Sequence, residues 1–230
     1  MRPVVAIVQA RMGSSRLPGK TLADLAGLPM LQFMLERVAH ARTLDGVVVA
    51  TTTAARDDRL AAIAAASGAM VFRGSEHDVL ARYVGAAEQA GAATVVRLTA
   101  DCPLLAPEVV DRLVQAYEVA DPRPDLVTNA PPAGRTYPDG MDVEVLSRAV
   151  LVRAHELATD PADREHATRL LHGGGFRVQV VHLPRDLGTV RITVDDEHDL
   201  QRVRAIVAAL PDRLFTLDDV IALLERTGAR

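Results

Sequence analysis

The sequence predicts an α/β fold whose mixed, mainly parallel sheet is flanked by helices. Short β-rich runs alternate with longer segments of helical periodicity along nearly all of the 230 residues, which is typical of crossover units. The first strand candidates are continuous apolar runs, as expected for strands buried on both faces. No flexible linker, low-complexity tract or internal repeat divides the chain. We therefore expect one domain, 1–230, with residues around 139–186 forming a lobe.

The expected elements follow from this alternation. The strands, in order, are Val4–Val8, Val47–Thr51, Met70–Phe72, Thr94–Leu98, Leu126–Thr128, Val143–Leu146, Val178–Val181 and Val190–Val194. The helices are Met30–Ala41, Arg56–Ala66, Val79–Ala90, Pro107–Tyr117, Arg148–Leu157, Arg164–Leu171, Glu197–Leu210 and Leu217–Arg226. The proline-rich stretch Asp121–Pro138 interrupts the rhythm and predicts strand ends with a long loop. In open α/β sheets ligands bind beyond the carboxyl ends of strands, so polar residues at those ends are the first candidates for a site.

Composition excludes several classes of function. A net charge of −4 and an aromatic content of 3% argue against a nucleic-acid binder, which needs a basic face or stacking platforms. No apolar run is long enough for a membrane helix, and Gln9 and Arg11 interrupt the first run before it could serve as a signal peptide. The single cysteine, Cys102, excludes an intramolecular disulfide and a multi-thiolate metal site, and packing is its expected role. We expect a cytoplasmic protein that associates with neither membranes nor nucleic acid.

The loop after the first strand, Gln9–Lys20, has the chemistry of an anion site. It combines flexible glycines, hydroxyl donors and three cations, namely Gly13, Gly19, Ser14, Ser15, Arg11, Arg16 and Lys20. Successive amides in such a turn form a nest for phosphate oxygens. Lys20 is the only lysine in the sequence, which favours a position where a compact ammonium is needed and arginine will not serve. A glycine-rich turn with solvated arginines is the structural alternative.

The loop differs from the P-loop of ATPases and kinases, G-x-x-x-x-G-K-[ST]. Five residues separate Gly13 from Gly19, and Pro18 lies inside the stretch that would form the nest. A P-loop opens into a long helix, whereas here Gly27 and Pro29 follow soon after Lys20. The P-loop interpretation therefore fits poorly.

Two predicted strands end in carboxylates that suit Mg²⁺. Asp101 follows the strand Thr94–Leu98 and precedes Pro103, while Asp195 follows Val190–Val194. Mg²⁺ is held in proteins by one or two carboxylates together with phosphate oxygens and water. An aspartate before a helix is also a common N-cap, and the residues alone favour that role for Asp195. Asp196 is nevertheless free to cap the helix instead.

At these residues the chain resembles a known family. IVQARMGSSRLPGKTL is similar to the signature of the cytidylyltransferase superfamily that includes the CMP-Kdo synthetases, and is closest to the branch named for spore coat polysaccharide biosynthesis protein F. The resemblance continues through RGSEHDVLARY, RLTADCPLL, TYPDGMDVEVL, DREHAT and ITVDDEHDL, in that branch's order. It implies a Rossmann-like nucleotidyltransferase (nucleotide-diphospho-sugar transferase) fold, Mg²⁺ as cofactor, and transfer of CMP from CTP to a hydroxyl of an acid sugar or related acceptor, with release of pyrophosphate.

The resemblance also assigns roles to individual residues. Catalytic groups would be Arg11, Arg16, Lys20 and Asp101, and the metal ligands would be Asp101 and Asp195. The nucleotide would contact Ala10, Arg11, Gly13, Ser14, Arg16 and Lys20 in the first loop, and Arg73 and Ser75 on the base side. The acceptor would contact Asn129, Tyr137, Asp142, Glu144, Arg164 and His166. A helix-surface salt bridge is the ordinary alternative for Arg164, and a solvent loop that caps the following helix is the alternative for Arg73 and Ser75.

Several points stay open at the level of the sequence. Thr99-Ala100 stands where CMP-Kdo synthetases have Gln-Gly, which weakens any transfer of their nucleobase or acid-sugar contacts to this chain. The resemblance implies a homodimer, with the lobe around 139–186 serving the acceptor or dimerisation. The alternatives are a non-catalytic nucleotide-binding partner protein and a glycosyltransferase that uses a nucleotide-sugar donor on the same fold.

Overall fold

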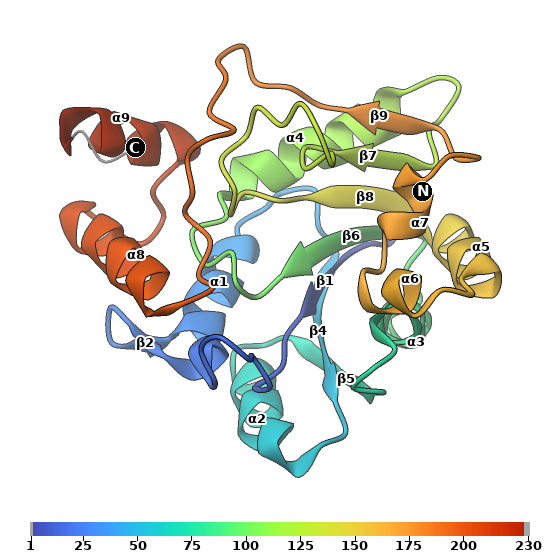
Figure 1. Cartoon of the computed structure of the whole chain (residues 1–230), viewed down its shortest axis with the longest axis horizontal. Coiled ribbons are helices and arrows are strands. Elements are labelled where there is room, and N and C mark those ends of the chain that lie inside the picture. The colour runs from blue at the N-terminus through green and yellow to red at the C-terminus, as the bar shows by residue number, and fades with distance from the viewer. Residues whose placement is uncertain (1, 228–230) are drawn as a thin grey trace.

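A seven-stranded mixed sheet forms the centre of the computed structural model, which describes residues 2–227 (Figure 1). Its strands are β1 (Val4–Gln9), β4 (Gly46–Thr52), β5 (Met70–Gly74), β6 (Thr94–Thr99), β7 (Leu126–Thr128), β8 (Glu144–Ser147) and β9 (Val178–Val180). The order across the sheet is β5-β4-β1-β6-β8-β7-β9. Only β8 runs against its neighbours; the other strands of this sheet are parallel to one another. The predicted mainly parallel α/β fold is confirmed.

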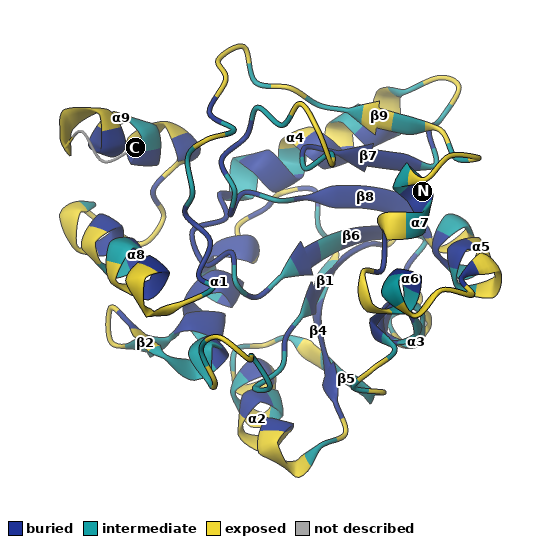
Figure 2. Ribbon diagram, in the orientation of Figure 1, coloured by how far each residue is buried: buried dark blue, intermediate teal, exposed yellow. Residues whose placement is uncertain are grey.

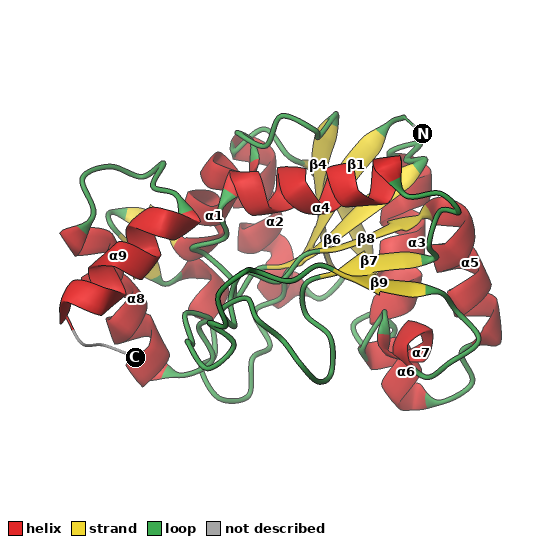
Figure 3. Cartoon of the chain, turned by 90° about the horizontal axis from the view of Figure 1, so that it is seen from above, coloured by secondary structure: helices red, strands yellow, loops and turns green. Residues whose placement is uncertain are grey.

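Helices cover both faces of the sheet (Figure 3). They are α1 (Met30–Val38), α2 (Asp58–Ala66), α3 (Val79–Gln89), α4 (Pro107–Val119), α5 (Arg148–Leu157), α6 (Pro161–Glu165), α7 (Arg169–His172), α8 (Glu197–Ala209) and α9 (Leu217–Thr227). Two short 3₁₀ turns, η1 (Lys20–Leu22) and η2 (Ala55–Asp57), and a small hairpin of β2 (Asp24–Leu25) and β3 (Leu28–Pro29) complete the elements. No helix within residues 2–227 is both long and apolar enough to cross a membrane.

Successive side chains of each strand point to opposite faces of the sheet, and this divides the core into two layers. In β1, Val4, Ala6 and Val8 pack with α1, α4, α8 and α9, whereas Val5 and Ile7 pack with α3 and α5. Successive side chains of a strand point to opposite faces, so a continuous apolar strand supplies both layers at once. Figure 2 shows the central strands almost entirely buried between these helices.

Two expected elements are wrong. Val190–Val194 is not a strand: it makes one isolated bridge, between Arg191 and Asp139. Its backbone amides bond to loops, Ile192 to the carbonyl of Asp139 at 2.7 Å and Val194 to that of Asp101 at 2.8 Å. The expected helix Arg164–Leu171 is two short helices, α6 and α7, with residues 166–168 between them.

The carboxyl ends of β1 and β6 meet side by side and place the loops that follow them. Gln9 of β1 lies opposite Thr99 of β6 in a parallel register. The first loop and the segment that begins at Asp101 therefore leave the sheet at the same edge. Lys20 begins only a short 3₁₀ turn and no long helix, consistent with the rejection of a P-loop.

The region 139–186 supplies β8 and β9 to the sheet and carries α5, α6 and α7 beside it. It is thus built into the sheet through two strands. Its role as an acceptor or dimerisation lobe stays a prediction.

Candidate active site

A cavity of about 290 Å³ opens at the shared carboxyl edge of β1 and β6. Its lining comes from the first loop, the end of β6 and the segment before α8: Gln9, Ala10, Arg11, Gly13, Ser14, Ser15, Arg16, Lys20, Thr21, Thr99, Ala100, Asp101 and Asp195. The structure therefore brings together the whole predicted phosphate-binding set and both predicted metal ligands. We call this space the first cavity.

Hydrogen bonds from two directions hold the first loop in shape. The Met12 amide donates to Asp57 at 2.8 Å, and the Thr21 hydroxyl donates to the Arg11 carbonyl at 3.1 Å. The amide of Gly19 donates to the Met12 carbonyl at 3.2 Å, which closes the loop on itself. Gly19 has φ 78°, a left-handed conformation that strongly favours glycine.

Donors remain available inside this loop. The backbone amides of Gly13, Ser15 and Arg16 have no hydrogen-bond partner among residues 2–227. All three residues line the first cavity. Free amides close together in one turn, with cationic side chains beside them, suit the oxygens of a polyphosphate.

Lys20 lies between the two aspartates. Its Nζ is 3.4 Å from Asp101 Oδ2 and 3.0 Å from Asp195 Oδ1, and it also donates to the Val194 carbonyl at 2.6 Å. The lysine side chain is only 12% exposed. One cation thus contacts a carboxylate from each of two segments that are distant in sequence.

The surroundings favour the ionised form of Asp195. Burial alone would raise the pKa of this carboxyl, but hydrogen bonds from Lys20 and Arg191 outweigh it and hold the pKa below its usual range. Arg16 adds an ion pair with Asp195 Oδ1 at 2.9 Å. Two carboxylates that already share one ammonium are a donor set of the kind that Mg²⁺ prefers, so the residues present fit the metal that the resemblance implies.

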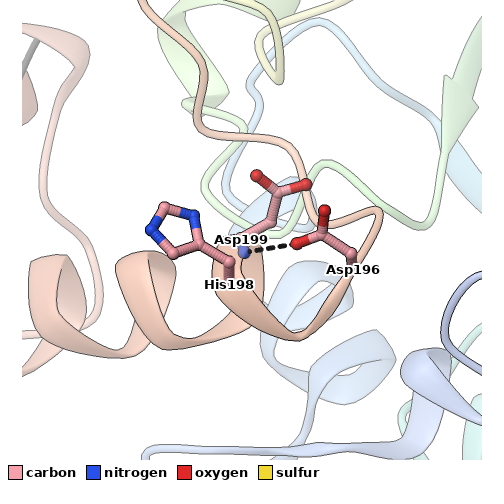
Figure 4. Close-up of side chains that lie close together, drawn as sticks. All are labelled: Asp196, His198 and Asp199. Carbon is pink, nitrogen blue, oxygen red and sulfur yellow. Dashed lines mark hydrogen bonds between the residues drawn. The ribbon is translucent and has the colours of Figure 1, made fainter.

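A group of side chains near the start of α8, Asp196, His198 and Asp199, lies close enough together to resemble a metal site (Figure 4). Asp196 accepts the Asp199 amide at 2.9 Å and so caps the helix. Asp199 accepts both the Asp195 amide and the Arg191 guanidinium. These bonds give Asp196 and Asp199 structural roles. They also separate the cap, Asp196, from the residue that lines the cavity, Asp195.

A second cavity of about 720 Å³ lies where β8 meets the loops after β7 and before α8. Charged residues of both signs line it together with two histidines: Arg97, Arg135, Asp139, Asp142, Glu144, Arg169, His166 and His172. Of the predicted acceptor residues it contains Asp142, Glu144 and His166. Asp142 is paired through both carboxylate oxygens with Arg135, at 2.8 and 3.0 Å.

Glu144 is almost fully buried and saturated with partners. Its carboxylate is bonded by Arg97 at 2.7 Å, by the Thr168 hydroxyl at 2.7 Å and by His172 at 3.2 Å. Burial alone would raise the pKa of Glu144, but Arg97 and these hydrogen bonds lower it to about 2. The carboxylate therefore serves first to order Arg97 and His172 at the wall of the second cavity.

Three predicted acceptor residues lie outside this lining. Asn129 is buried and bridges the Met141 carbonyl and the Val143 amide, and Tyr137 is buried with its hydroxyl near Arg112. Arg164 forms an ion pair at 3.2 Å with Asp78, the N-cap of α3, and a salt bridge is the ordinary alternative for this residue. The structure thus gives each of them a structural partner.

The predicted base-side residues also lie outside the first cavity. Arg73 donates to the carbonyls of Thr52 and Ala54 and pairs with Asp58. The Ser75 hydroxyl accepts the amides of His77 and Asp78, as a loop that leads into α3 would require. Their contact with a nucleobase stays a prediction.

The sequence did not identify several lining residues, among them Gln9, Thr21 and Thr99. Gln9 and Thr99 are the last residues of adjacent parallel strands. Their position at the carboxyl edge of the sheet is the feature that could have identified them as site residues. Arg191 was also missed. It donates to Asp195 Oδ2 at 2.6 Å and to Asp139 at 2.7 Å, contacts that depend on how distant loops meet.

Comparison with known proteins identifies the family of the chain. Residues 5–193 match the model of the family described as "Cytidylyltransferase". The chain is 31% identical to "Spore coat polysaccharide biosynthesis protein SpsF" of Bacillus subtilis (strain 168), over 98% of this chain and 95% of that protein. It is 41% identical to "3-deoxy-manno-octulosonate cytidylyltransferase" of Anaeromyxobacter sp. (strain Fw109-5), over 51% of this chain and 48% of that protein.

A solved structure is similar over nearly the full length. The cytidylyltransferase from Leptospira borgpetersenii serovar Hardjo-bovis (strain JB197) superposes with a TM-score of 0.94 at 32% identity, covering 98% of this chain and 95% of that one. The expected resemblance, the fold class and nucleotidyltransferase activity are therefore confirmed. The chain belongs to the cytidylyltransferase family.

Proposed function

We propose that this cytidylyltransferase performs a Mg²⁺-dependent transfer of CMP from CTP to a hydroxyl of an acid sugar or related small-molecule acceptor, releasing pyrophosphate. One observation carries the proposal: a single ammonium, Lys20 Nζ, lies within 3.4 Å of carboxylates from two separate segments at the edge of a cation-rich loop. Polyphosphate and divalent cation would thus share one space, the first cavity.

The first loop would bind the triphosphate. Lys20, Arg11 and Arg16 supply positive charge, and the free amides of Gly13 and Ser15 supply directed donors. Nucleotidyl transfer depends mainly on alignment and on neutralising charge, so these groups would both orient the α-phosphorus and stabilise the departing pyrophosphate.

The two aspartates would hold the metal. Asp101 and Asp195 would exchange their contact with Lys20 for Mg²⁺, which frees the ammonium for phosphate oxygens. When bound there, Mg²⁺ would polarise the α-phosphate and lower the pKa of the acceptor hydroxyl. Arg191 would keep hold of the second oxygen of Asp195 and so preserve the direction of its carboxylate.

The second cavity would take the acceptor. It is larger than the first and offers both cationic and anionic groups, which suits a polyhydroxy acid, and Asp142 and His166 are its predicted contacts.

Homodimer formation, implied by kinship, is proposed as well; light scattering during size-exclusion chromatography tests it.

Pyrophosphate release tests the reaction. The protein is incubated with each nucleoside triphosphate, Mg²⁺ and a panel of acid sugars, other polyols and phosphonates, and we expect release with CTP and a single class of acceptor. Asp101→Asn removes one carboxylate charge and should abolish turnover while the melting temperature stays close to that of the wild type. Near-normal turnover in Asp101→Asn would contradict the metal assignment.

Calorimetry separates the alternatives. CTP with Mg²⁺ should bind more tightly than a CDP-sugar or a UDP-sugar. The reverse order would favour a glycosyltransferase, and tight CTP binding without turnover across the whole panel would favour a nucleotide-binding partner protein.

A further inference from the structure

Arg191 joins the two cavities through one guanidinium group. Its Nη2 donates to Asp195 Oδ2 at 2.6 Å, and its Nη1 donates to Asp139 Oδ2 at 2.7 Å. Asp195 lines the first cavity and Asp139 lines the second. A carboxylate from each cavity is therefore held by the same planar side chain.

The backbone fixes where this side chain can reach. The Asp139 amide donates to the Val190 carbonyl at 2.9 Å, and the Ile192 amide donates back to the Asp139 carbonyl at 2.7 Å. At Gly140, with φ 116°, a Cβ would lie 2.7 Å from the backbone of Ile192, so only glycine permits the two segments to approach this closely. The side chain of Arg191 thus starts from a rigid base.

The far side of each carboxylate is also occupied. Asp195 Oδ1 accepts from Lys20 at 3.0 Å and pairs with Arg16 at 2.9 Å. Asp139 Oδ1 accepts from Arg135 at 3.3 Å, and Arg135 in turn holds Asp142. Alternating charges therefore run without a gap from the loop that would bind phosphate to the wall of the second cavity.

We infer that Arg191 is a positioning residue which couples the two cavities. A change in the charge or the contacts of Asp139 in the second cavity therefore changes the affinity of the first cavity for nucleotide. The inference rests on the proposed function for the identity of the nucleotide as CTP. Binding of CTP and Mg²⁺ draws Lys20, Arg16 and Asp195 into new contacts, and Arg191 transmits the resulting change in Asp195 to Asp139. Coupling of this kind is reciprocal. An acceptor that engages Asp139 would therefore change the affinity for CTP by the same factor by which CTP changes the affinity for the acceptor.

A double-mutant cycle tests the coupling without knowledge of the acceptor. CTP affinity is measured by calorimetry at fixed Mg²⁺ for the wild type, Asp139→Asn, Arg191→Ala and the double variant. We expect Arg191→Ala to weaken CTP binding roughly ten-fold, as is typical when the partner of a metal-binding carboxylate is removed. Asp139→Asn should weaken binding several-fold in the wild type and have no effect in the Arg191→Ala background.

Two further variants separate coupling from simpler effects. Arg191→Lys keeps the positive charge but cannot reach two carboxylates as a planar fork does, so we expect it to weaken binding like Arg191→Ala. Arg202→Ala is the matched control: Arg202 contacts the Arg191 carbonyl and lies 3.8 Å from Asp199, but the structure gives it no bond to Asp195 or Asp139. Its CTP affinity should equal that of the wild type.

Each outcome of these measurements supports or overturns the coupling. If Asp139→Asn has the same effect in both backgrounds, or none in either, Arg191 does not couple the cavities. Tighter CTP binding in Arg191→Ala would mean that its charge merely competes with Mg²⁺, and would overturn the inference. A lower melting temperature with unchanged CTP affinity would reduce Arg191 to a structural role. A wild-type protein that binds no CTP would contradict the proposed function itself, and the inference with it.

Discussion

At the scale of single residues, the chemistry of the first loop could be predicted because its side chains are close in sequence. Lys20 and the glycines of this loop indicate an anion site whatever the tertiary structure, and the strand end at Asp101 sets the edge where it must lie. Arg191 could not be found in the same way. It stands inside an apolar stretch, and its partners, Asp139 and Asp195, are chosen by the packing of loops.

Substitution of Lys20 tests the role of the ammonium. Lys20→Ala should weaken the binding of CTP with Mg²⁺ by about 1.5–3 kcal/mol, the usual contribution of a hydrogen bond to a charged group. Lys20→Arg should restore only part of this, because a planar guanidinium cannot replace a compact charge at a side chain that is only 12% exposed. Calorimetry measures the CTP affinity of both variants, and Arg42→Ala, at an exposed arginine, is the control. Equal affinity in all three variants would rule out a contact between Lys20 and the triphosphate.

Neighbouring aspartates should separate into two functions. Asp196→Ala removes the cap of α8 and should lower the free energy of unfolding by about 1 kcal/mol while turnover is retained. Asp195→Asn should abolish turnover, because the carboxylate charge at the first cavity is lost. Urea unfolding and the pyrophosphate assay measure the two effects. If Asp195→Asn stays active and Asp196→Ala does not, the assignment of metal ligand and cap is reversed.

At the scale of elements, the pattern of apolar residues predicted the strands of the sheet, because burial of a strand requires apolar side chains along it. It failed for Val190–Val194, which has the apolar composition of a strand but gives its hydrogen bonds to loops. It failed also for Arg164–Leu171, where His166 leaves helical geometry and Thr168 turns toward Glu144. In both places a tertiary contact overrides the local pattern, and His166 and Thr168 of the second place line the second cavity.

The pairing of β6 with β8 gives a prediction about pH. Arg97 and Glu144 lie directly opposite each other, and their ion pair is largely buried. Glu144→Gln should lower the free energy of unfolding by about 3 kcal/mol near neutral pH, because the Arg97 charge loses its partner. Glu144 has a lowered folded-state pKa, so the stability it contributes is present above about pH 4.5 and is lost as the pH falls toward about 2.

Urea unfolding at a series of pH values measures this difference. The gap between wild type and Glu144→Gln should be constant above about pH 5 and shrink below it. Glu156→Gln is a suitable control and should show no comparable gap, because Glu156 is an exposed residue of α5. A gap between wild type and Glu144→Gln that does not change with pH would mean that the charge of Glu144 contributes nothing to stability.

At the scale of the whole molecule, the mainly parallel sheet follows from the alternation of strands and helices, but the docking of the last two helices does not. Helices α8 and α9 pack against α1 and α4 through an apolar cluster that includes Val203, Val220 and Leu224. The amphipathic patterns of α8 and α9 predict only that each buries a face. A polar residue also holds the segment that leads into α9: Arg37 of α1, which is completely buried and donates to the Phe215 carbonyl.

Arg37 therefore yields a prediction about the cohesion of the fold. Its guanidinium donates to the carbonyls of Leu104 and Leu105 before α4 and of Phe215 before α9, and lies 3.7 Å from the centre of the Phe215 ring. Arg37→Met keeps most of the volume but leaves these buried carbonyls without a donor. Burial lowers the pKa of Arg37 to about 10, which indicates that holding its charge there is costly.

Arg37→Met loses the hydrogen bonds of the guanidinium but also removes the cost of burying its charge. We therefore expect the free energy of unfolding to fall by about 2–4 kcal/mol, which is less than the summed contributions of the lost hydrogen bonds. The control is Arg42→Met, which changes an exposed arginine shortly after α1 and should shift stability by less than about 0.5 kcal/mol. Urea unfolding followed by circular dichroism measures both. Equal stability of the two variants would mean that apolar contacts alone hold α9 in place and that the carbonyls find water when Arg37 is removed.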